Sequence, residues 1–241
     1  MHRHDIRIFC FGLETARHFL KEGTRAAITG KNPAPLRCRP KKSGAAFCLS
    51  RPNASDAAAQ KFVAETLRRE FGGLDILFVN AGIADLKTVE QWDEAAFDRS
   101  FANNIKGPFF LIQALLPIFA NPASIVLNAS VNAHIGMPNT SVYGASKAAL
   151  LSLTRTLSGE LISRGIRVNA VSPGPIATPL YDKLGLSADD LKKVAASIQS
   201  QVPAGRFGNA SEIANAIVFL ASDESAFTVG SELLIDGGMS L

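Results

Sequence analysis

The sequence predicts a single α/β domain: a doubly wound parallel sheet with helices on both faces. Three observations predict it. Short apolar segments alternate with longer amphipathic segments along the 241 residues, which is the pattern of repeated β–α–β units. The segment 75–79 has continuous apolar character, as expected for a strand that is covered on both faces. Hydrophobic residues make up 47% of the chain and charged residues 19%, so the chain can bury a large core.

Before residue 80 the pattern alternates between helix and strand. Glycine, which tolerates the left-handed conformation that ends helices, follows both predicted helices. An acceptor side chain, Ser55 or Asp56, precedes the second helix and can cap its N-terminus. These features predict, in order, a helix over 13–21, a strand over 25–29, a helix from the cap to Phe71 and a strand over 75–79.

After residue 80 the same alternation continues. A long helix is predicted over 95–116 because Pro117 ends it, and Gly107-Pro108 predicts a kink within it. A second long helix over 142–163 ends before Gly165. The remaining predicted elements are strands over 124–127, 168–171 and 232–235, and helices over 187–200 and 211–221.

Residues 33–53 fit this alternation poorly. Prolines at 33, 35, 40 and 52 interrupt the segment, and no helix is predicted there. No linker or change in composition marks a second domain, so one domain is expected to span 1–241, with departures from the pattern at 1–11 and 33–53.

Charge and cysteine content narrow the possible partners. The formal net charge of +4 comes with a basic stretch at 37–51 that has almost no acidic residues and a single aromatic, Phe47. Such a stretch is expected to be a solvated loop and not a nucleic-acid site. The three cysteines are odd in number and lack C-x-x-C spacing, which predicts a reducing, cytoplasmic setting and no metal site. No apolar run reaches the roughly 18 residues that cross a membrane, so no membrane partner is expected.

The sharpest chemical pattern is Tyr143-Gly-Ala-Ser-Lys147. The two ends of this pattern lie four positions apart on a predicted helix, so their side chains share one face. An ammonium near a phenol favours the phenolate, and the Lys147 ammonium is therefore expected to lower the pKa of Tyr143. Tyr143 is then suited to exchange a proton with a substrate oxygen. Because Y-x-x-x-K also occurs by coincidence on helix surfaces, the pattern needs support from elsewhere in the chain.

Support comes from small and polar residues that follow predicted strands. Ser130 ends one strand, Asn80-Ala81-Gly82 ends another, and Pro173-Gly174 ends a third. The carboxyl ends of parallel strands meet at one edge of the sheet, where open α/β folds bind ligands. Asn104 lies on the predicted long helix, and Thr178 follows the third strand end.

With these motifs in this order, the chain resembles the short-chain dehydrogenase/reductase family. The resemblance runs from about Gly12 to Leu241, apart from 33–53, and implies a Rossmann-type fold. Within the family the chain is most similar to members that resemble 3-oxoacyl-acyl-carrier-protein reductase and glucose 1-dehydrogenase. The C-terminal motifs Gly205-Arg-Phe-Gly208, Phe219-Leu-Ala-Ser-Asp223 and Asp236-Gly-Gly238 are typical of that group.

The resemblance implies an oxidoreductase that transfers hydride between a nicotinamide cofactor and a carbonyl or alcohol of a small molecule. Tyr143 is then the general acid or base, Lys147 assists it, Ser130 holds the substrate oxygen, and Asn104 holds a water of the proton relay. The implied cofactor-binding residues are Gly12, Lys31, Asn80, Ala81, Gly82, Tyr143, Lys147, Pro173, Gly174, Ile176 and Thr178. A homo-oligomer, tetramer or dimer, is also implied.

The N-terminal region departs from the family pattern. The glycine-rich turn that lets the family's backbone approach a pyrophosphate is matched here only by Gly12, and Phe9, Cys10 and Phe11 stand where small residues are expected. One hypothesis is that this segment and 33–53 are translated out of frame, in which case another frame of the encoding nucleotides restores the glycines. Lys31 follows a strand end where an acid would hold the ribose of NAD(H), so NADP(H) is favoured over NAD(H).

Each motif also has a purely structural interpretation. Asn80-Ala81-Gly82 can be only a tight turn, Asn104 a helix residue bonded to its neighbours, and Ser130 a buried core hydroxyl. Thr178 can cap a following helix. His134 is expected to line the pocket or a loop, because no G-x-S-x-G turn surrounds Ser130 as a hydrolase would require.

Two rival functions remain open. A non-catalytic relative would keep the fold but bind cofactor poorly, because its glycine-rich turn is missing. A sugar-nucleotide epimerase or dehydratase shares Tyr-x-x-x-Lys, but such chains usually carry an added substrate lobe, and this chain ends shortly after Asp236-Gly-Gly238.

Overall fold

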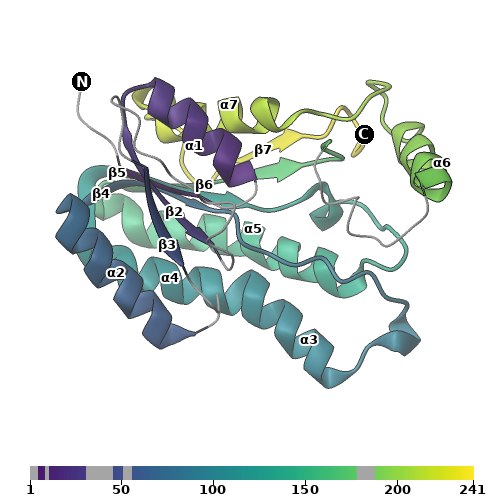
Figure 1. Cartoon of the computed structure of the whole chain (residues 1–241), viewed down its shortest axis with the longest axis horizontal. Coiled ribbons are helices and arrows are strands. Elements are labelled where there is room, and N and C mark those ends of the chain that lie inside the picture. Colours follow the sequence, from purple (N-terminus) through teal and green to yellow (C-terminus); the bar gives the residue numbers. More distant parts are fainter. Residues whose placement is uncertain (1–4, 9–10, 31–45, 51–55, 178–187) are drawn as a thin grey trace.

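The computed structural model describes residues 5–8, 11–30, 46–50, 56–177 and 188–241. Its strands are all parallel and form two hydrogen-bonded groups in the orders β1-β2-β3 and β4-β5-β6-β7. Strands β1 and β4 lie next to each other, so the two groups continue one another (Figure 1). The strands are β1 (Asp5–Ile8), β2 (Arg25–Gly30), β3 (Ala46–Ser50), β4 (Leu74–Val79), β5 (Phe119–Asn128), β6 (Ile166–Pro173) and β7 (Glu232–Ile235).

Helices cover both faces of these strands. On one face lie α1 (Phe11–Lys21) and α7 (Ala210–Ala221); on the other lie α2 (Ala57–Phe71), α4 (Gly107–Leu115) and α5 (Ser141–Leu161). The alternation of side chains along β4 explains why both faces of the strands are covered by helices. Ile76 and Phe78 are buried against α1 and α7, and Leu77 and Val79 are buried against the other helices. The predicted α/β fold class is therefore confirmed.

Two helices lie outside this core. Helix α3 (Glu94–Phe101) leads into α4 through a short irregular turn. Helix α6 (Ala188–Gln199) stands at the edge of the molecule, apart from the helices that cover the strands (Figure 1).

The helix predicted over 95–116 is not continuous, and this prediction needs correction. Helix α3 ends at Phe101, a π-helical turn covers Ala102–Lys106, and α4 begins at Gly107. Pro108 has no N–H to donate to the carbonyl of Asn104, so the regular helical bond is lost there. The Gly107 amide donates instead to Ala102 O, five residues back. The irregularity thus lies directly before Gly107-Pro108, the pair at which a kink was predicted.

Local sequence explains where the other elements begin and end. Of the two possible caps of α2, Asp56 is the one used, since its Oδ1 accepts from the Ala58 amide at 2.9 Å. Gly72 and Gly165 end α2 and the segment after α5 with φ of +79° and +72°, which suit glycine. Strands β1 and β3 are additions to the prediction, and β3 lies inside the segment 33–53, for which no helix was predicted.

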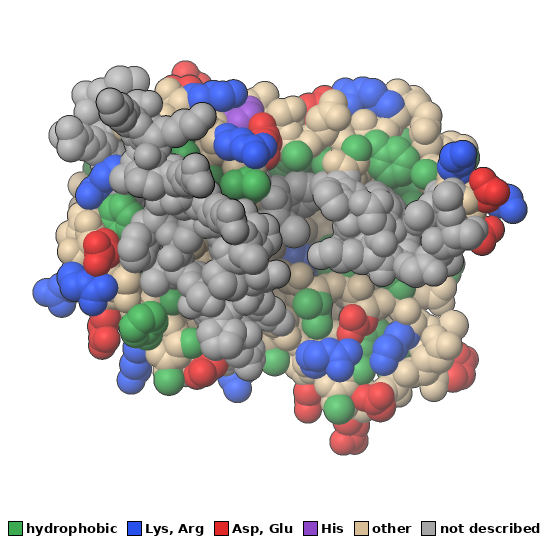
Figure 2. All heavy atoms as spheres, viewed as in Figure 1, with side chains coloured by type: hydrophobic (Ala, Val, Ile, Leu, Met, Phe, Trp, Pro, Cys, Tyr) green, Lys and Arg blue, Asp and Glu red, His purple; other side chains and the backbone are tan. Residues whose placement is uncertain are grey.

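The described surface carries both signs of charge. Figure 2 shows Lys and Arg side chains intermingled with Asp and Glu on the face that it presents. Some charged side chains of the described residues form ion pairs, as Arg206 does with Glu212 at 2.6 Å. In the ranges that the structure describes, no helix combines the length and apolar character needed to cross a bilayer. No group of three or more His, Cys, Asp or Glu side chains in those ranges is placed to hold a metal ion.

Candidate active site

Four polar side chains meet beside the carboxyl ends of β4 and β5. Ser130 follows β5, Asn104 comes from the turn between α3 and α4, and Tyr143 and Lys147 come from the first two turns of α5. Asn104, Ser130 and Lys147 are buried, and Tyr143 is half-buried. The structure thus brings together the four residues that the sequence predicted to be catalytic.

Lys147 is the cation of this group, and it is deeply buried. Its side chain is only 3% exposed, and its Nζ donates to the carbonyl oxygen of Asn128 at 2.6 Å. Burial disfavours the charged form and lowers the pKa of Lys147 from 10.5 to about 8. The Nζ atom lies 5.8 Å from the centre of the Tyr143 ring, so the charge faces the phenol ring from nearby.

Tyr143 does not show the lowered pKa that the sequence predicted. Burial raises the pKa of the Tyr143 phenol, and a hydrogen bond with Ser130 opposes that rise only in part. Loss of solvation is the larger of these two effects, so the direction is opposite to the one that the spacing of Tyr143 and Lys147 predicted. The phenol is therefore held in its protonated form near neutral pH.

Ser130 is positioned by the short helical turn that follows it. This 3-10 turn spans Val131–Ala133, and Ser130 caps it by accepting the Asn132 amide on Oγ at 3.2 Å. Gly144 of α5 allows the turn to pack closely, because a Cβ at that position would lie 2.8 Å from Asn132 O. A small residue at 144 is therefore needed to bring Tyr143 and Ser130 together.

Asn104 ties three parts of the site to one another. Its Oδ1 accepts from the Ile83 amide at 2.8 Å, and its Nδ2 donates to Ile83 O at 3.0 Å and to Ser146 Oγ at 2.9 Å. The side chain is completely buried. Asn104 therefore joins the segment after β4 to helix α5, as the structural interpretation of this residue anticipated.

The segment Asn80-Ala81-Gly82 packs against the same residues. Asn128 Nδ2 donates to Asn80 Oδ1 at 2.6 Å, which links the ends of β4 and β5. A Cβ on Gly82 would lie 3.2 Å from Asn104 Oδ1 and 3.3 Å from Lys147 Nζ. The backbone at Gly82 therefore passes directly over the two polar groups.

The end of β6 is fixed by the C-terminal part of the chain. The Gly174 amide donates to Ile235 O at 3.0 Å, and a Cβ on Gly174 would lie 2.6 Å from the Cα of Asp236. Pro173 is buried, and the buried Ile176 pairs with Gly208. The motifs Gly205-Arg-Phe-Gly208 and Asp236-Gly-Gly238 thus both contact the segment that follows β6.

The remaining predicted residues are placed only in part. Gly12 lies in the first turn of α1 and is buried. Lys31 and Thr178 lie outside the described residues. Sequence reasoning missed Asn128 and Ser146, which hold Lys147 and Asn104 in place. Asn128 lies two positions before Ser130, and Ser146 one position before Lys147, so proximity to the motifs was the available signal.

Comparison with known proteins decides the family. A family model described as enoyl-(acyl carrier protein) reductase matches residues 10–240. The chain belongs to the short-chain dehydrogenase/reductase family. It is 39% identical to a 3-oxoacyl-acyl-carrier-protein reductase of Thermotoga maritima over 189 residues, which cover 78% of this chain and 74% of that protein. It is 34% identical to a 2-keto-3-deoxy-L-fuconate dehydrogenase of Xanthomonas campestris over 233 residues, 95% of this chain and 76% of that protein.

Solved structures of short-chain dehydrogenases agree with the fold. The L-sorbose reductase of Gluconobacter frateurii, solved with NADPH and L-sorbose, superposes with a TM-score of 0.93 at 27% identity, covering 100% of this chain and 97% of that chain. A short-chain alcohol dehydrogenase from Sinorhizobium meliloti gives a TM-score of 0.90 at 31% identity, covering 99% of this chain and 97% of that chain. The expected Rossmann-type fold is confirmed.

Short-chain dehydrogenases bind a nicotinamide cofactor, and the donors of this site fit one. Among the described residues, Lys147 Nζ has a single acceptor, Asn128 O, and an ammonium carries three N–H groups. Two donors therefore remain for the hydroxyl groups of a ribose. A Cβ at the exposed Gly82 would lie 3.3 Å from this Nζ, so glycine leaves room for a ligand beside the ammonium.

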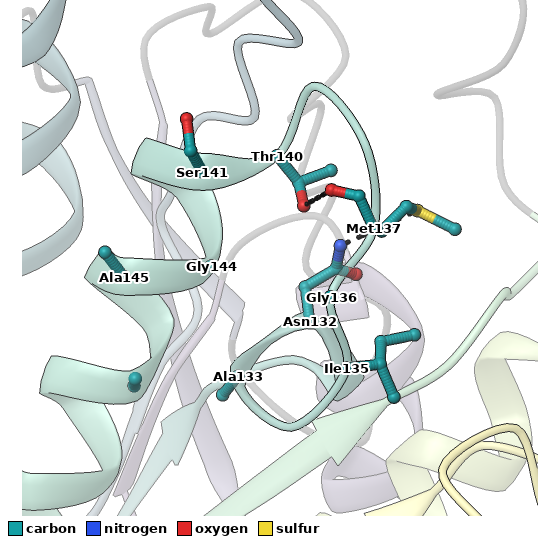
Figure 3. A pocket seen from close by; sticks show the side chains of 10 residues that line it. Asn132, Ala133, Ile135, Gly136, Met137, Thr140, Ser141, Gly144 and Ala145 are labelled. Atoms are coloured by element: carbon teal, nitrogen blue, oxygen red, sulfur yellow. Dashed lines mark hydrogen bonds between the residues drawn. The ribbon is translucent and has the colours of Figure 1, made fainter. Parts of the chain in front are cut away.

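A cavity of about 280 Å³ lies next to this site. The loop over 132–140 forms one wall, and Gly144, Ala145 and Ala148 of α5 form the other (Figure 3). Thr140 Oγ1 donates to Met137 O at 2.7 Å and holds the loop in its curved form. Neither Ser130 nor Tyr143 lines this cavity, although Asn132 and Gly144, which lie close to them in the sequence, do.

Proposed function

We propose that this protein transfers hydride between NADP(H) and a carbonyl or alcohol group of a small molecule. One observation carries the proposal: Tyr143, Ser130 and Lys147 converge beside the carboxyl ends of parallel strands, with the Gly82 backbone passing over the lysine. The phenol, the hydroxyl and the ammonium are the groups needed to hold and protonate a carbonyl oxygen while its carbon is reduced.

Each residue has a distinct task in this proposal. Ser130 Oγ donates a hydrogen bond to the substrate oxygen, and the Tyr143 hydroxyl transfers its proton to that oxygen. Lys147 holds the ribose and stabilises the phenolate that forms when Tyr143 loses its proton. The cofactor supplies or accepts the hydride when bound.

Asn104 is proposed to hold a water of the proton relay. Its side chain is committed to Ile83 and Ser146, so this task falls to its backbone carbonyl. Pro108 has no N–H to donate to the Asn104 carbonyl, and this supports the proposal that the carbonyl binds a water.

The proton states suit the reductive direction. Burial raises the pKa of Tyr143, so the phenol carries a proton to donate at neutral pH. With a pKa of about 8, Lys147 is about 90% ammonium at pH 7, and that charge is lost as the pH rises through about 8. Reduction is therefore expected to be faster near neutral pH and to decline above about pH 8.

NADP(H) is proposed over NAD(H) for two reasons. Lys31 directly follows Gly30, the last residue of β2, where a cation would pair with a 2′-phosphate. The similar L-sorbose reductase was solved with NADPH. The predicted pairing of Lys31 itself stays a proposal.

We also propose that the protein is a cytoplasmic homo-oligomer, tetramer or dimer. Large apolar side chains are exposed at the C-terminal edge, including Phe227, which is fully exposed, and Leu233 and Leu234 on β7. Phe97 and Phe109 are exposed on α3 and α4. Light scattering coupled to size-exclusion chromatography measures the mass of the assembly, and a monomer at micromolar concentration would overturn this part of the proposal.

The first experiment is a fluorescence titration of the purified protein with NADPH and, in parallel, with NADH. Tighter binding of NADPH than of NADH supports the proposal. Lys31→Ala should then remove the preference, while Lys61→Ala, at an exposed position of α2, should leave it unchanged. Preference for NADH would contradict the role of Lys31.

Turnover is tested with a panel chosen from the chemistry of the relatives: a 3-oxoacyl thioester, a ketose and a simple ketone. Oxidation of NADPH with at least one of them, and its loss in Tyr143→Phe, supports the proposal. The rival is the non-catalytic relative, which the bulky side chains of Phe9, Cys10 and Phe11 favour. Failure to bind either cofactor would favour that rival or the out-of-frame hypothesis, which the encoding nucleotides would then test.

A further inference from the structure

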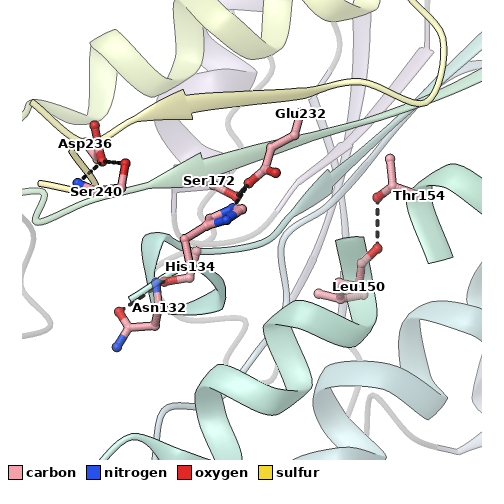
Figure 4. Close-up of polar contacts among 9 residues, drawn as sticks. Asn132, His134, Leu150, Thr154, Ser172, Glu232, Asp236 and Ser240 are labelled. Atoms are coloured by element: carbon pink, nitrogen blue, oxygen red, sulfur yellow. Dashed lines mark hydrogen bonds and ion pairs between the residues drawn. The ribbon is translucent and has the colours of Figure 1, made fainter. Parts of the chain in front are cut away.

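We infer that Glu232 is a positioning residue: together with His134 and Ser172 it fastens the turn that carries Ser130 to the end of β6. The three residues come from three different elements and meet at one carboxylate oxygen (Figure 4). This inference rests on the proposed function, since it assigns these residues a part in holding Ser130 for hydride transfer.

The contacts converge on Glu232 Oε1. His134 Nε2 lies 2.6 Å from this oxygen, and Ser172 Oγ donates to the same atom. An ionised carboxylate can only accept, so the histidine nitrogen that faces it carries a proton. We name the set of His134, Ser172 and Glu232 the carboxylate clamp.

The register of the sheet explains how Glu232 reaches both partners. Glu232 begins β7 and pairs with Ala170 of β6, and Ser172 lies two positions further along the same strand. Side chains two positions apart in a strand share one face, so Ser172 and Glu232 point to the same side of the sheet. Ala170 packs in the core on the side of α5, which is also the side of the Ser130 turn.

The clamp connects to Ser130 through backbone hydrogen bonds. The His134 amide donates to Val131 O at 2.9 Å, and the Ala133 amide donates to Ser130 O at 3.0 Å. Ser130 and His134 are thus the two ends of one hydrogen-bonded turn. The contact of the His134 side chain with Glu232 of β7 therefore fixes the direction in which the turn leaves β5.

On the side of Ser172, the clamp contacts the carboxyl end of β6, which is proposed to bind the cofactor. Ser172 is fully buried and directly precedes Pro173-Gly174. Through a single carboxylate, the turn that holds the substrate oxygen is therefore tied to the segment that faces the nicotinamide. Hydride transfer requires these two parts to keep a fixed distance.

The choice of residue at position 232 also points to this role. Glutamate is a poor strand former, and the next three residues of β7 are Leu233, Leu234 and Ile235. The Glu232 side chain is only 19% exposed, so its carboxylate is largely withdrawn from water. Two hydrogen-bond donors offset that loss of solvation, whereas an apolar residue would continue the strand without needing them.

The first test measures the clamp without relying on turnover. Hydrogen exchange is followed in the segment 131–137 for the wild type, Glu232→Ala and Glu224→Ala. Glu224 is an exposed carboxylate near the end of α7 and serves as the matched control. We expect exchange in this segment to be about tenfold faster in Glu232→Ala than in the wild type. The control should exchange at the wild-type rate. Unchanged exchange in Glu232→Ala would overturn the clamp.

The second test measures its effect on the reaction. We expect Glu232→Ala to lower kcat about tenfold, with the KM for NADPH within about twofold, and to raise the isotope effect from deuterated NADPH. Glu232→Gln keeps an acceptor and should recover most of the rate. Adding His134→Ala to Glu232→Ala should cause no further loss, because both act through one contact.

Three results would separate the possible failures. Equal losses of kcat in Glu232→Ala and Glu224→Ala, or a loss that follows the unfolded fraction with an unchanged isotope effect, would overturn the positioning role. Failure of Glu232→Gln to recover rate would do the same. A wild-type protein without any turnover would overturn the proposed function and the catalytic part of this inference, while the exchange experiment would still decide whether the clamp exists.

Discussion

Replacing Lys147 with methionine should stabilise the protein while abolishing its activity. Burial lowers the pKa of Lys147 from 10.5 to about 8, and the side chain is 3% exposed. A difference of about 2.5 in pKa between the unfolded and folded chain means that the charged lysine reduces the free energy of unfolding by roughly 3 kcal/mol. Because folding lowers the pKa of this lysine, the full reduction in the free energy of unfolding applies below the pKa of the folded state. The reduction becomes smaller as the pH rises towards the pKa of the unfolded state.

Methionine has a similar length and carries no charge. It removes the roughly 3 kcal/mol loss but leaves Asn128 O without its donor, which costs about 1–2 kcal/mol. We therefore expect Lys147→Met to be more stable than the wild type by about 1–2 kcal/mol near pH 7. Because the wild type recovers stability as its lysine becomes neutral, this advantage should shrink by about 2 kcal/mol near pH 9.5.

Urea denaturation of both proteins at the two pH values measures the difference directly. Groups other than Lys147 titrate in both proteins and cancel in the comparison. Lys61→Met, at an exposed lysine, controls for the loss of a positive charge and should show no pH-dependent difference. A difference between Lys147→Met and the wild type that stays the same from about pH 7 to 9.5 would refute the reasoning.

Three further substitutions test other parts of the site and the fold. Tyr143→Phe should lower kcat by about 10² to 10⁴ while leaving NADPH affinity unchanged, as steady-state kinetics and titration will show; retained turnover would exclude Tyr143 as the proton donor. Gly144→Ala places a Cβ 2.8 Å from Asn132 O and should lower the free energy of unfolding in urea by about 1–3 kcal/mol; an unchanged value would show that the turn moves to accommodate the methyl group. Arg167→Met removes a buried guanidinium that donates to Leu220 O and to three further acceptors, and should lower stability by about 3 kcal/mol or more; a loss below about 1 kcal/mol would show that these bonds contribute little.

The sequence predicted the elements whose patterns are local. Helices α2, α5 and α7 and strands β4, β5 and β6 all occur where periodicity and end residues placed them. These helices are long enough for an apolar stripe to be recognised, and the strands contain short runs of apolar residues. Their boundaries differ from the prediction by a few residues, because the ends depend on caps and partners outside the element.

Strands β1 and β3 could not be predicted in the same way. They are four and five residues long, and their sequences, DIRI and AFCLS, carry no clear signal on their own. Each is parallel to β2, with Ile6 opposite Ala26 and Phe47 opposite Ala27. Pairing with a neighbour far along the chain, and not local preference, makes these segments strands.

The candidate site was predictable where its residues lie close in sequence. Four positions on a helix place Tyr143 and Lys147 on one face, and that relation is independent of the rest of the fold. The carboxylate clamp joins residues 60 and 98 positions apart, so only the packed structure reveals it. His134 was expected only to line a pocket or loop, and its bond to Glu232 had no signal in the sequence.

The direction of the Tyr143 pKa was wrong in the sequence prediction for a physical reason. Spacing gives the distance between two charges but says nothing about solvation. Here the phenol and the ammonium are both withdrawn from water, and loss of solvation dominates both pKa values. A pattern of residues therefore identifies which groups can interact, while burial decides in which direction they titrate.

Departures from regular geometry concentrate around the carboxyl ends of the strands. The π-helical turn at Ala102–Lys106 shifts the face of the helix so that Asn104 enters the site. Gly144 and Gly174 allow contacts that a Cβ would prevent, and Lys147 is buried against its solvation preference. Of these features, the buried Lys147 lowers the stability of the fold, since a neutral residue of similar length would avoid the loss of solvation. Their common effect is to bring polar groups together at this edge of the sheet, which is the arrangement that the proposed reaction requires.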